Sequence, residues 1–259
     1  MVAESLKKLR SALPSGVELV AVSKFHPVER LMEAYNAGQR LFGENRPQEL
    51  AAKAPQMPAD VQWHFIGHLQ TNKLKLVLPY VTMVQSVDSF HLLEAINNWC
   101  AANSKTIDIL LELHLGAEET KSGFTEEEIL SVISAAGTPS ETHGHPRPCK
   151  REGPTASAQR AQRGGKGLSE AKEVSEGVPA PLNGVRIRGL MGMATHTDDM
   201  AVVEADFARI EALFNKIKAL DLLGFDQLSI GMSGDWPLAV KHGATMVRIG
   251  TDIFGPREY

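Results

Sequence analysis

The sequence predicts a single-domain α/β protein built as a closed, TIM-like (β/α)8 barrel. Eight short apolar segments alternate with amphipathic segments along the chain, as strands and helices do in a parallel sheet. The length of 259 residues and the hydrophobic content of 43% allow one large core. An open, doubly wound sheet is the alternative, but eight strands favour the closed barrel.

The eight predicted strands are apolar at nearly every position, which is typical of strands buried on both faces of a sheet. In chain order they are residues 18–23, 40–43, 63–67, 83–87, 108–115, 186–194, 227–231 and 246–250. Because parallel strands of a barrel all end at one face, we expect the residues that follow them to form one site.

The segments between the strands show helical periodicity. Over residues 202–220, apolar side chains recur every three or four positions. The helix after the first strand is predicted to bury Leu31 and Ala34 and to stop at Gly38. A further helix is predicted to begin after Thr125, an N-cap residue followed by acidic residues that suit the helix dipole.

Residues 138–181 interrupt this alternation. The segment is rich in proline and glycine, and its large apolar residues are only Leu168, Val174 and Val178. Such a composition buries too little surface to offset the entropy of ordering. We therefore predict one barrel domain over residues 1–259, interrupted by a disordered insertion at 138–181.

Composition and charge argue against several classes of protein. The net charge of −4 does not favour nucleic acid or an anionic membrane as a partner. The chain has neither a long apolar span nor an apolar N-terminal signal segment. Cys100 and Cys149 share no metal-ligand spacing. We expect a cytoplasmic protein without a metal, and a monomer rather than a weak dimer.

Glycine-rich turns follow the last two predicted strands. Residues 231–235 read GMSGD and residues 250–255 read GTDIFG, while Arg248 lies within the eighth strand. Small residues let main-chain N–H groups approach a phosphate, and Ser233 and Thr251 add hydroxyl donors. Because the loops after strands seven and eight of such barrels often bind phosphate, a phosphate site is favoured over two ordinary tight turns.

Lys24 stands at the end of the first predicted strand. The apolar run before it would bury the stem of the side chain, and a closed barrel would direct the amine towards the mouth. A partly desolvated lysine amine is a better nucleophile for carbonyls. A lysine and a phosphate site in one mouth indicate a Schiff base with pyridoxal 5′-phosphate (PLP) or with a sugar phosphate. The alternative for Lys24 is a solvated loop residue.

Other polar residues lie at or after the remaining strand ends. They are Glu44, Asn45, Arg46, Gln48, His64, His68 and His196. For His64 a structural hydrogen bond is favoured over a ligand contact, and for His68 both interpretations stay open. Met83 is interpreted as core.

Eight ordered motifs resemble the pyridoxal phosphate homeostasis protein family. They are AVSK, FGENRPQE, WHFIGHLQTNK, SVDS, TKSGF, RGLMGMAT, LSIGMSGD and VRIGTDIFG, and they cover nearly the whole chain except the insertion. The resemblance implies the fold of the alanine racemase N-terminal domain, with PLP bound covalently to Lys24. It further implies a phosphate site at Ser233, Gly250 and Thr251, with Met232 and Ser229 nearby, Arg248 facing the pyridine nitrogen, Asn45 beside the cofactor and His196 near the mouth.

The same resemblance implies a protein that buffers and delivers PLP, with PLP-dependent apo-enzymes as recipients and no catalytic residues. A PLP-dependent amino-acid racemase or decarboxylase is the first alternative. A racemase of this fold needs an acid on the second face of the cofactor, but Tyr35, Tyr80 and Tyr259 are not convincingly placed at strand ends, and we expect no further domain after residue 255. An aldolase acting on a sugar phosphate is disfavoured, since Arg248 has no obvious role in binding a sugar.

Overall fold

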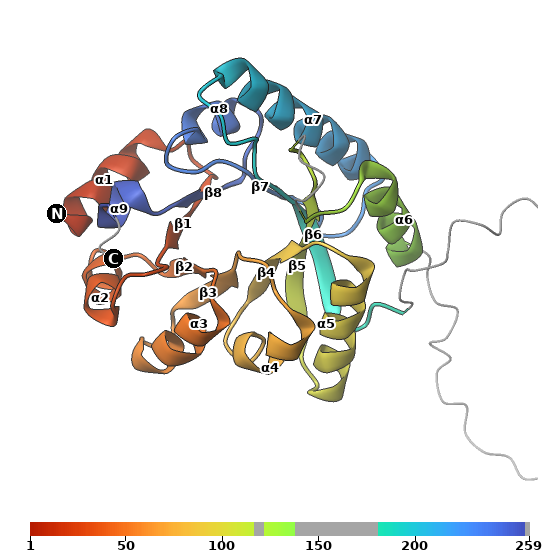
Figure 1. Ribbon diagram of the computed structural model, residues 1–259, viewed down its shortest axis with the longest axis horizontal. Coiled ribbons are helices and arrows are strands. Elements are labelled where there is room, and N and C mark those ends of the chain that lie inside the picture. Colours follow the sequence, from red (N-terminus) through yellow and green to blue (C-terminus); the bar gives the residue numbers. More distant parts are fainter. Residues whose placement is uncertain (117–121, 138–180, 257–259) are drawn as a thin grey trace, which may run out of the picture.

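The computed structural model describes residues 1–116, 122–137 and 181–256. Within these ranges, eight parallel strands close into a barrel in which neighbours along the chain are neighbours around the circle. Helices surround the barrel on the outside (Figure 1). The predicted (β/α)8 fold is confirmed. The insertion predicted at 138–181 lies outside the described residues, apart from Pro181.

All eight predicted strands are present, with ends that differ from the prediction by at most two residues. They are β1 (Glu18–Val22), β2 (Leu41–Glu44), β3 (Gln62–Phe65), β4 (Met83–Val87), β5 (Ile107–Leu113), β6 (Val185–Gly192), β7 (Gln227–Ser229) and β8 (Met246–Ile249). β1 pairs with both β2 and β8, which closes the barrel.

Helices and short turns connect the strands. They are α1 (Val2–Ala12), α2 (Val28–Asn36), α3 (Pro47–Lys53), η1 (Ala54–Gln56), η2 (Thr71–Lys73), α4 (Leu74–Val77), α5 (Phe90–Ala102), α6 (Glu126–Gly137), α7 (Met200–Lys218), α8 (Trp236–Lys241) and α9 (Thr251–Phe254). In Figure 1, α1 lies beside α9, so the two ends of the described chain meet on the outside of the barrel.

The predicted buried residues of α2 and the predicted N-cap of α6 are both present in the structure. Leu31 and Ala34 of α2 are fully buried. At the start of α6, the Thr125 hydroxyl accepts from the Glu128 N–H (3.2 Å), and the Glu128 carboxylate accepts from the Thr125 N–H (2.8 Å). This reciprocal capping satisfies main-chain donors that the first turn of a helix leaves without partners.

The apolar core has two layers, because side chains alternate between the two faces of each strand. The larger layer lies between the strands and the helices. The smaller one comprises Val20, Met83, Leu110, Met191 and Met246, one residue from each of five strands, and we assign it to the barrel interior. Met83 is therefore core, as predicted.

The alternation continues beyond the strand ends. Val20 and Val22 share the inner face of β1, and the next position on that face is Lys24. On β8, Met246 and Arg248 share the inner face in the same way. The strands therefore aim Lys24 and Arg248 into the barrel mouth.

Three further observations concern other classes of site. No helix in the described ranges is long and apolar enough to cross a bilayer. The same ranges hold no cluster of three or more histidine, cysteine or acidic side chains that could bind a metal ion. Cys100 is buried and forms no disulfide within the described residues.

Candidate functional site

A cavity of about 680 Å³ opens at the C-terminal ends of the strands. Its walls come from the ends of β1, β2, β3, β5, β6, β7 and β8. Of the nine residues predicted for a cofactor site, it is lined by Lys24, Asn45, His196, Met232, Ser233, Arg248, Gly250 and Thr251. The fold thus brings together residues that are up to 227 positions apart in the sequence, from Lys24 to Thr251.

Ser229 is the predicted residue that does not line the cavity. It is completely buried at the end of β7, and both its carbonyl and its hydroxyl accept hydrogen bonds from Nη1 of Arg248, at 2.8 and 2.7 Å. The prediction extended this strand to residue 231, but β7 ends at Ser229, and the first cavity residue after it is Met232 in the following turn. Ser229 therefore supports Arg248 from below the cavity.

Arg248 is held rigidly within the barrel. It is 4% exposed, and its Nη2 donates to the Gly192 carbonyl (2.9 Å) in addition to the bonds with Ser229. Burial lowers the pKa of Arg248 to about 10, although Glu112 and Asp235 favour its charged form. The guanidinium is therefore a fixed positive charge at neutral pH.

A chain of hydrogen bonds crosses the barrel beneath the cavity. The Ser229 hydroxyl donates to Oε1 of Gln85 (2.7 Å), and Nε2 of Gln85 lies 2.8 Å from Nδ1 of His64. Because burial lowers the pKa of His64 to about 3, its ring is neutral and Nδ1 accepts from the amide. The predicted structural hydrogen bond of His64 is confirmed.

Lys24 occupies a tight turn after β1. The turn is closed by a hydrogen bond from the His26 N–H to the Ser23 carbonyl (3.1 Å). The next residue, Phe25, has a φ of +68°, in the left-handed region that bulky residues rarely adopt. Lys24 itself is partly buried and lines the cavity. Its amine is thus carried by a constrained turn rather than by a long loop.

The turns after the neighbouring strands β7 and β8 supply small and hydroxyl-bearing residues. Gly231 has a φ of +93°, and a Cβ there would lie 2.6 Å from Ala239, so glycine is required. A Cβ on Gly250 would lie 3.2 Å from the Val22 carbonyl, so a side chain would crowd the approach of β8 to β1. Ser233 and Thr251 line the cavity beyond these two glycines.

Asn45 follows β2 and lines the cavity. Its Oδ1 atom is buried and has no hydrogen-bond partner among the residues that the structure describes. Leaving a buried acceptor unpaired costs free energy, so this atom is suited to a ligand donor or an ordered water. The tight contact of Gly67 with the Asn45 backbone, which leaves no room for a Cβ, holds the residue at this place.

Glu112 is a cavity residue that the sequence did not reveal. It is the next-to-last residue of β5 and is 5% exposed. Burial raises its pKa to about 7, with a further increase from Asp88, while Arg248 and His68 act in the opposite direction. His68 also lines the cavity, and its Nδ1 lies 2.8 Å from Oδ2 of Asp88. The available signal was an acid that interrupts the apolar run from Ile109 to Leu113.

His196 lies at the exposed rim of the cavity, as expected for a residue near the mouth. Asp235 adds a negative charge to the same wall, and its carboxylate accepts from the Met232 N–H (2.5 Å). The cavity thus combines a lysine amine, a buried arginine, an unpartnered amide oxygen and two hydroxyl-bearing turns. This set suits a compact polar ligand that carries an anionic group and a carbonyl.

Comparison with known proteins gives one consistent relationship. The family described as alanine racemase, N-terminal domain, matches residues 2–143 and 159–258. The pyridoxal phosphate homeostasis protein of Pasteurella multocida is 34% identical over 249 residues, covering 95% of this chain and 88% of that protein. The protein of the same name from Schizosaccharomyces pombe is 33% identical, covering 96% and 87%. The structure of PipY from Synechococcus elongatus with PLP bound has 32% identity and a TM-score of 0.75, covering 98% of this chain and all of that one.

Proposed function

This chain belongs to the pyridoxal phosphate homeostasis protein family and carries the alanine racemase N-terminal domain, and from that premise we propose that it binds PLP as a Schiff base on Lys24. One observation carries the proposal: Lys24, Arg248 and the turns after β7 and β8 line a single cavity. The proposed role is to buffer PLP in the cytoplasm and to deliver it to PLP-dependent apo-enzymes, without catalytic turnover.

The residues present fit this cofactor. Lys24 supplies a primary amine for the aldehyde, and the small and hydroxyl-bearing residues Ser233, Gly250 and Thr251 suit the phosphate. The buried Oδ1 of Asn45 leaves one acceptor for a ligand. The cavity volume of about 680 Å³ lies within the usual range for cofactor sites.

Each group has a defined task in the proposed complex. PLP supplies a reactive aldehyde. The Nζ atom of Lys24 would condense with that aldehyde to form a carbon–nitrogen double bond, and the aldehyde oxygen would leave as water. Arg248 stays charged at neutral pH, so it disfavours a proton on a ring nitrogen that faces it. An unprotonated ring would withdraw electrons less strongly, which suits storage better than catalysis.

One observation favours a second candidate function, a PLP-dependent amino-acid racemase or decarboxylase. Glu112 lines the cavity with a pKa of about 7, and such a carboxyl can both give and accept a proton near neutral pH. Against this function, neither Tyr35 nor Tyr80 lines the cavity, and the Tyr35 hydroxyl donates to Asp60 on the outside of the barrel.

The first experiment tests the Schiff base. We expect the protein to show a visible absorbance band with PLP that disappears on borohydride reduction, with the reduced adduct mapped by mass spectrometry to the peptide containing Lys24. Lys24→Ala should remove the band and preserve the circular dichroism spectrum, whereas Lys105→Ala, on the far side of the barrel, should keep it. A band that persists unchanged in Lys24→Ala would refute the assignment.

The second experiment separates carrier from enzyme. The loaded protein is mixed with an apo-enzyme that needs PLP, and recovery of that enzyme's activity reports transfer. Amino-acid racemisation and decarboxylation are measured in parallel by chiral separation and by CO₂ release. Transfer without turnover is expected. Robust turnover without transfer would reverse the order of the two candidates. Sedimentation equilibrium of the same sample tests the proposed monomer.

A further inference from the structure

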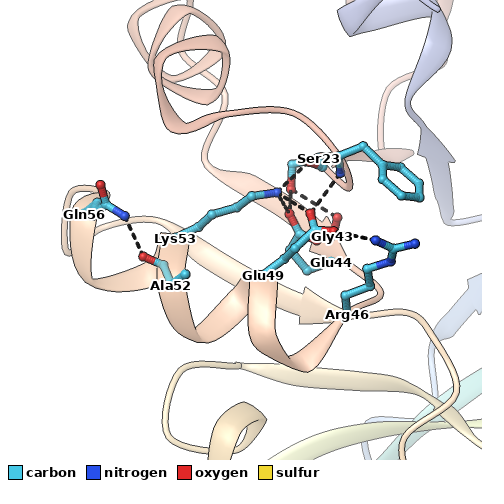
Figure 2. Close-up of polar contacts among 9 residues, drawn as sticks. Ser23, Gly43, Glu44, Arg46, Glu49, Ala52, Lys53 and Gln56 are labelled. Carbon is cyan, nitrogen blue, oxygen red and sulfur yellow. Dashed lines mark hydrogen bonds and ion pairs between the residues drawn. The ribbon is translucent and has the colours of Figure 1, made fainter. Parts of the chain in front are cut away.

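A buried cluster of charges lies beside the turn that carries Lys24. Lys53, at the end of α3, is 8% exposed, and its Nζ lies 2.7 Å from Oε1 of Glu44 and 2.8 Å from Oε2 of Glu49. Glu44 is completely buried at the end of β2. Figure 2 shows the ammonium group of Lys53 directed towards Glu44 and Ser23, which lie outside α3, and towards Glu49 of the same helix.

The cluster binds the main chain on both sides of Lys24. On one side, Nζ of Lys53 donates to the Ser23 carbonyl (3.0 Å), and the Ser23 hydroxyl donates to Oε1 of Glu44 (2.8 Å). On the other side, the Phe25 N–H donates to Oε2 of Glu49 (2.9 Å). Both carboxylates are held by the same Lys53 ammonium, so one cation connects the two tethers.

The turn needs such support because Phe25 has a left-handed backbone, at φ +68°. A non-glycine residue keeps this conformation only where its surroundings impose it. The bond from Phe25 N–H to Glu49 is one constraint. Another is the Arg46 guanidinium, which lies 4.2 Å from the centre of the Phe25 ring and is paired with Glu49 (3.4 Å).

The charges of the cluster depend on one another. Burial raises the pKa of Glu44, and Lys53 opposes this effect most strongly. Partial burial would also raise the pKa of Glu49, but the bonds from Lys53 and Phe25 outweigh it, so this pKa is lowered. Removing Lys53 alone would leave Glu44 buried and unpaired, which destabilises a fold whatever else the lysine does.

We propose that Lys53 is a positioning residue for Lys24, fixing through Ser23 and through Glu49 the turn that presents the reactive amine to the cavity. The inference rests on the proposed function, because it assigns a task in the formation of the Lys24 Schiff base. Lys53 does not line the cavity and acts only through the turn. Its loss should therefore weaken the covalent step and spare binding of the ring and phosphate.

Two probes separate these steps. PLP reports both binding and bond formation, whereas 4-deoxypyridoxine 5′-phosphate lacks the aldehyde and reports binding alone. The main variant is Glu44→Gln/Lys53→Met, which removes both members of the buried ion pair and so avoids an unpaired Glu44. Glu49→Ala is the second variant, because it removes the Phe25 tether and keeps the Glu44–Lys53 pair. Lys105→Met is the matched control: Lys105 also donates to main-chain carbonyls, those of Leu78 and Pro79, but lies away from the cavity.

In the double variant we expect the apparent affinity for PLP to fall by about tenfold or more, because small misplacements of a reacting group have large effects. Affinity for the deoxy analogue should stay within about twofold of the wild type, and Glu49→Ala should show a smaller effect in the same direction. The control should match the wild type with both probes.

Each other outcome overturns the proposal. PLP affinity at the wild-type level in a folded double variant, or in Glu49→Ala if the double variant does not fold, would show that the tethers do not position Lys24. Equal losses for both probes would show a general structural role. A wild-type protein that binds the deoxy analogue but forms no borohydride-reducible bond at Lys24 would instead refute the proposed function, and the positioning role with it.

Discussion

Replacing Glu112 with glutamine is expected to stabilise the cofactor-free protein at pH 8 but hardly at pH 5. Glu112 is 5% exposed, and burial raises its pKa to about 7 from an ordinary value of 4.5. Between pH 4.5 and pH 7, the carboxyl of Glu112 keeps a proton in the folded state that it has lost in the unfolded state. Stability contributed by this side chain therefore falls as the pH rises from 4.5 to 7, and stays low above pH 7. Glutamine has nearly the same shape and carries no proton to lose.

The magnitude follows from the two pKa values. A difference of one unit between the folded and unfolded pKa corresponds to about 1.4 kcal/mol. The ionised Glu112 therefore lowers the free energy of unfolding by about 3 kcal/mol at pH 8. At pH 5 the carboxyl is still protonated in the folded state, and the penalty is below about 1 kcal/mol. The favourable interaction with Arg248 and the unfavourable one with Asp88 are already contained in the raised pKa.

The assay is urea-induced unfolding of wild type and Glu112→Gln at pH 5 and pH 8. The buried His64, whose pKa is lowered to about 3, makes both proteins less stable in acid, and its contribution cancels in the difference between them. Glu94→Gln, on the exposed face of α5, is the control and should give no gain at either pH. A gain that is the same at pH 5 and pH 8, or a loss at pH 8, would refute the reasoning.

Three further predictions concern single contacts. Arg248→Ala should lose PLP faster than wild type during dialysis followed by absorbance, because the fixed positive charge of the cavity wall is gone; equal retention would contradict its role. Thr125→Ala should lower the free energy of urea unfolding by about 1 kcal/mol, since the Glu128 N–H loses its cap, and an unchanged midpoint would contradict this. Gly189→Ala should lower the free energy of unfolding by roughly 1–3 kcal/mol or more, and the thermal midpoint with it, because a Cβ would overlap the Gln227 carbonyl. Wild-type stability of this variant would contradict the close approach of Gly189 to Gln227.

The positions of Lys24, Ser233, Arg248 and Thr251 could be predicted because they depend on the simplest property of a parallel barrel. Every strand runs in the same direction, so residues at strand ends meet at one face whatever their distance in the sequence. Alternation along the strand then decides which of them point inward. Neither step requires knowledge of how the helices pack.

Ser229, Glu112 and the Glu44–Lys53 pair required the structure. Ser229 was expected near the phosphate; in the structure its side chain is buried, accepts from Arg248 and does not line the cavity. The raised pKa of Glu112 depends on burial and on neighbours from other strands. Lys53 meets Glu44 because α3 packs against the end of β2, and that contact is set by tertiary structure. Sequence patterns identify the face of the barrel, whereas depth and charge pairing arise from packing.

The two cations of the cavity are fixed by different means, and this difference has a consequence. Arg248 is held from within the barrel by Ser229, and Ser229 in turn by Gln85, so its position depends on the strands themselves. Lys24 lies on a turn and depends on Lys53 from outside the barrel. Changes in the hydrogen bonds inside the barrel, such as Gln85→Leu, should therefore lower the affinity for PLP and for its deoxy analogue together. Changes in the cluster of Lys53, Glu44 and Glu49 should lower the affinity for PLP alone. If both kinds of change reduced the two affinities equally, retention of the ring and capture of the aldehyde would not be separable in this barrel.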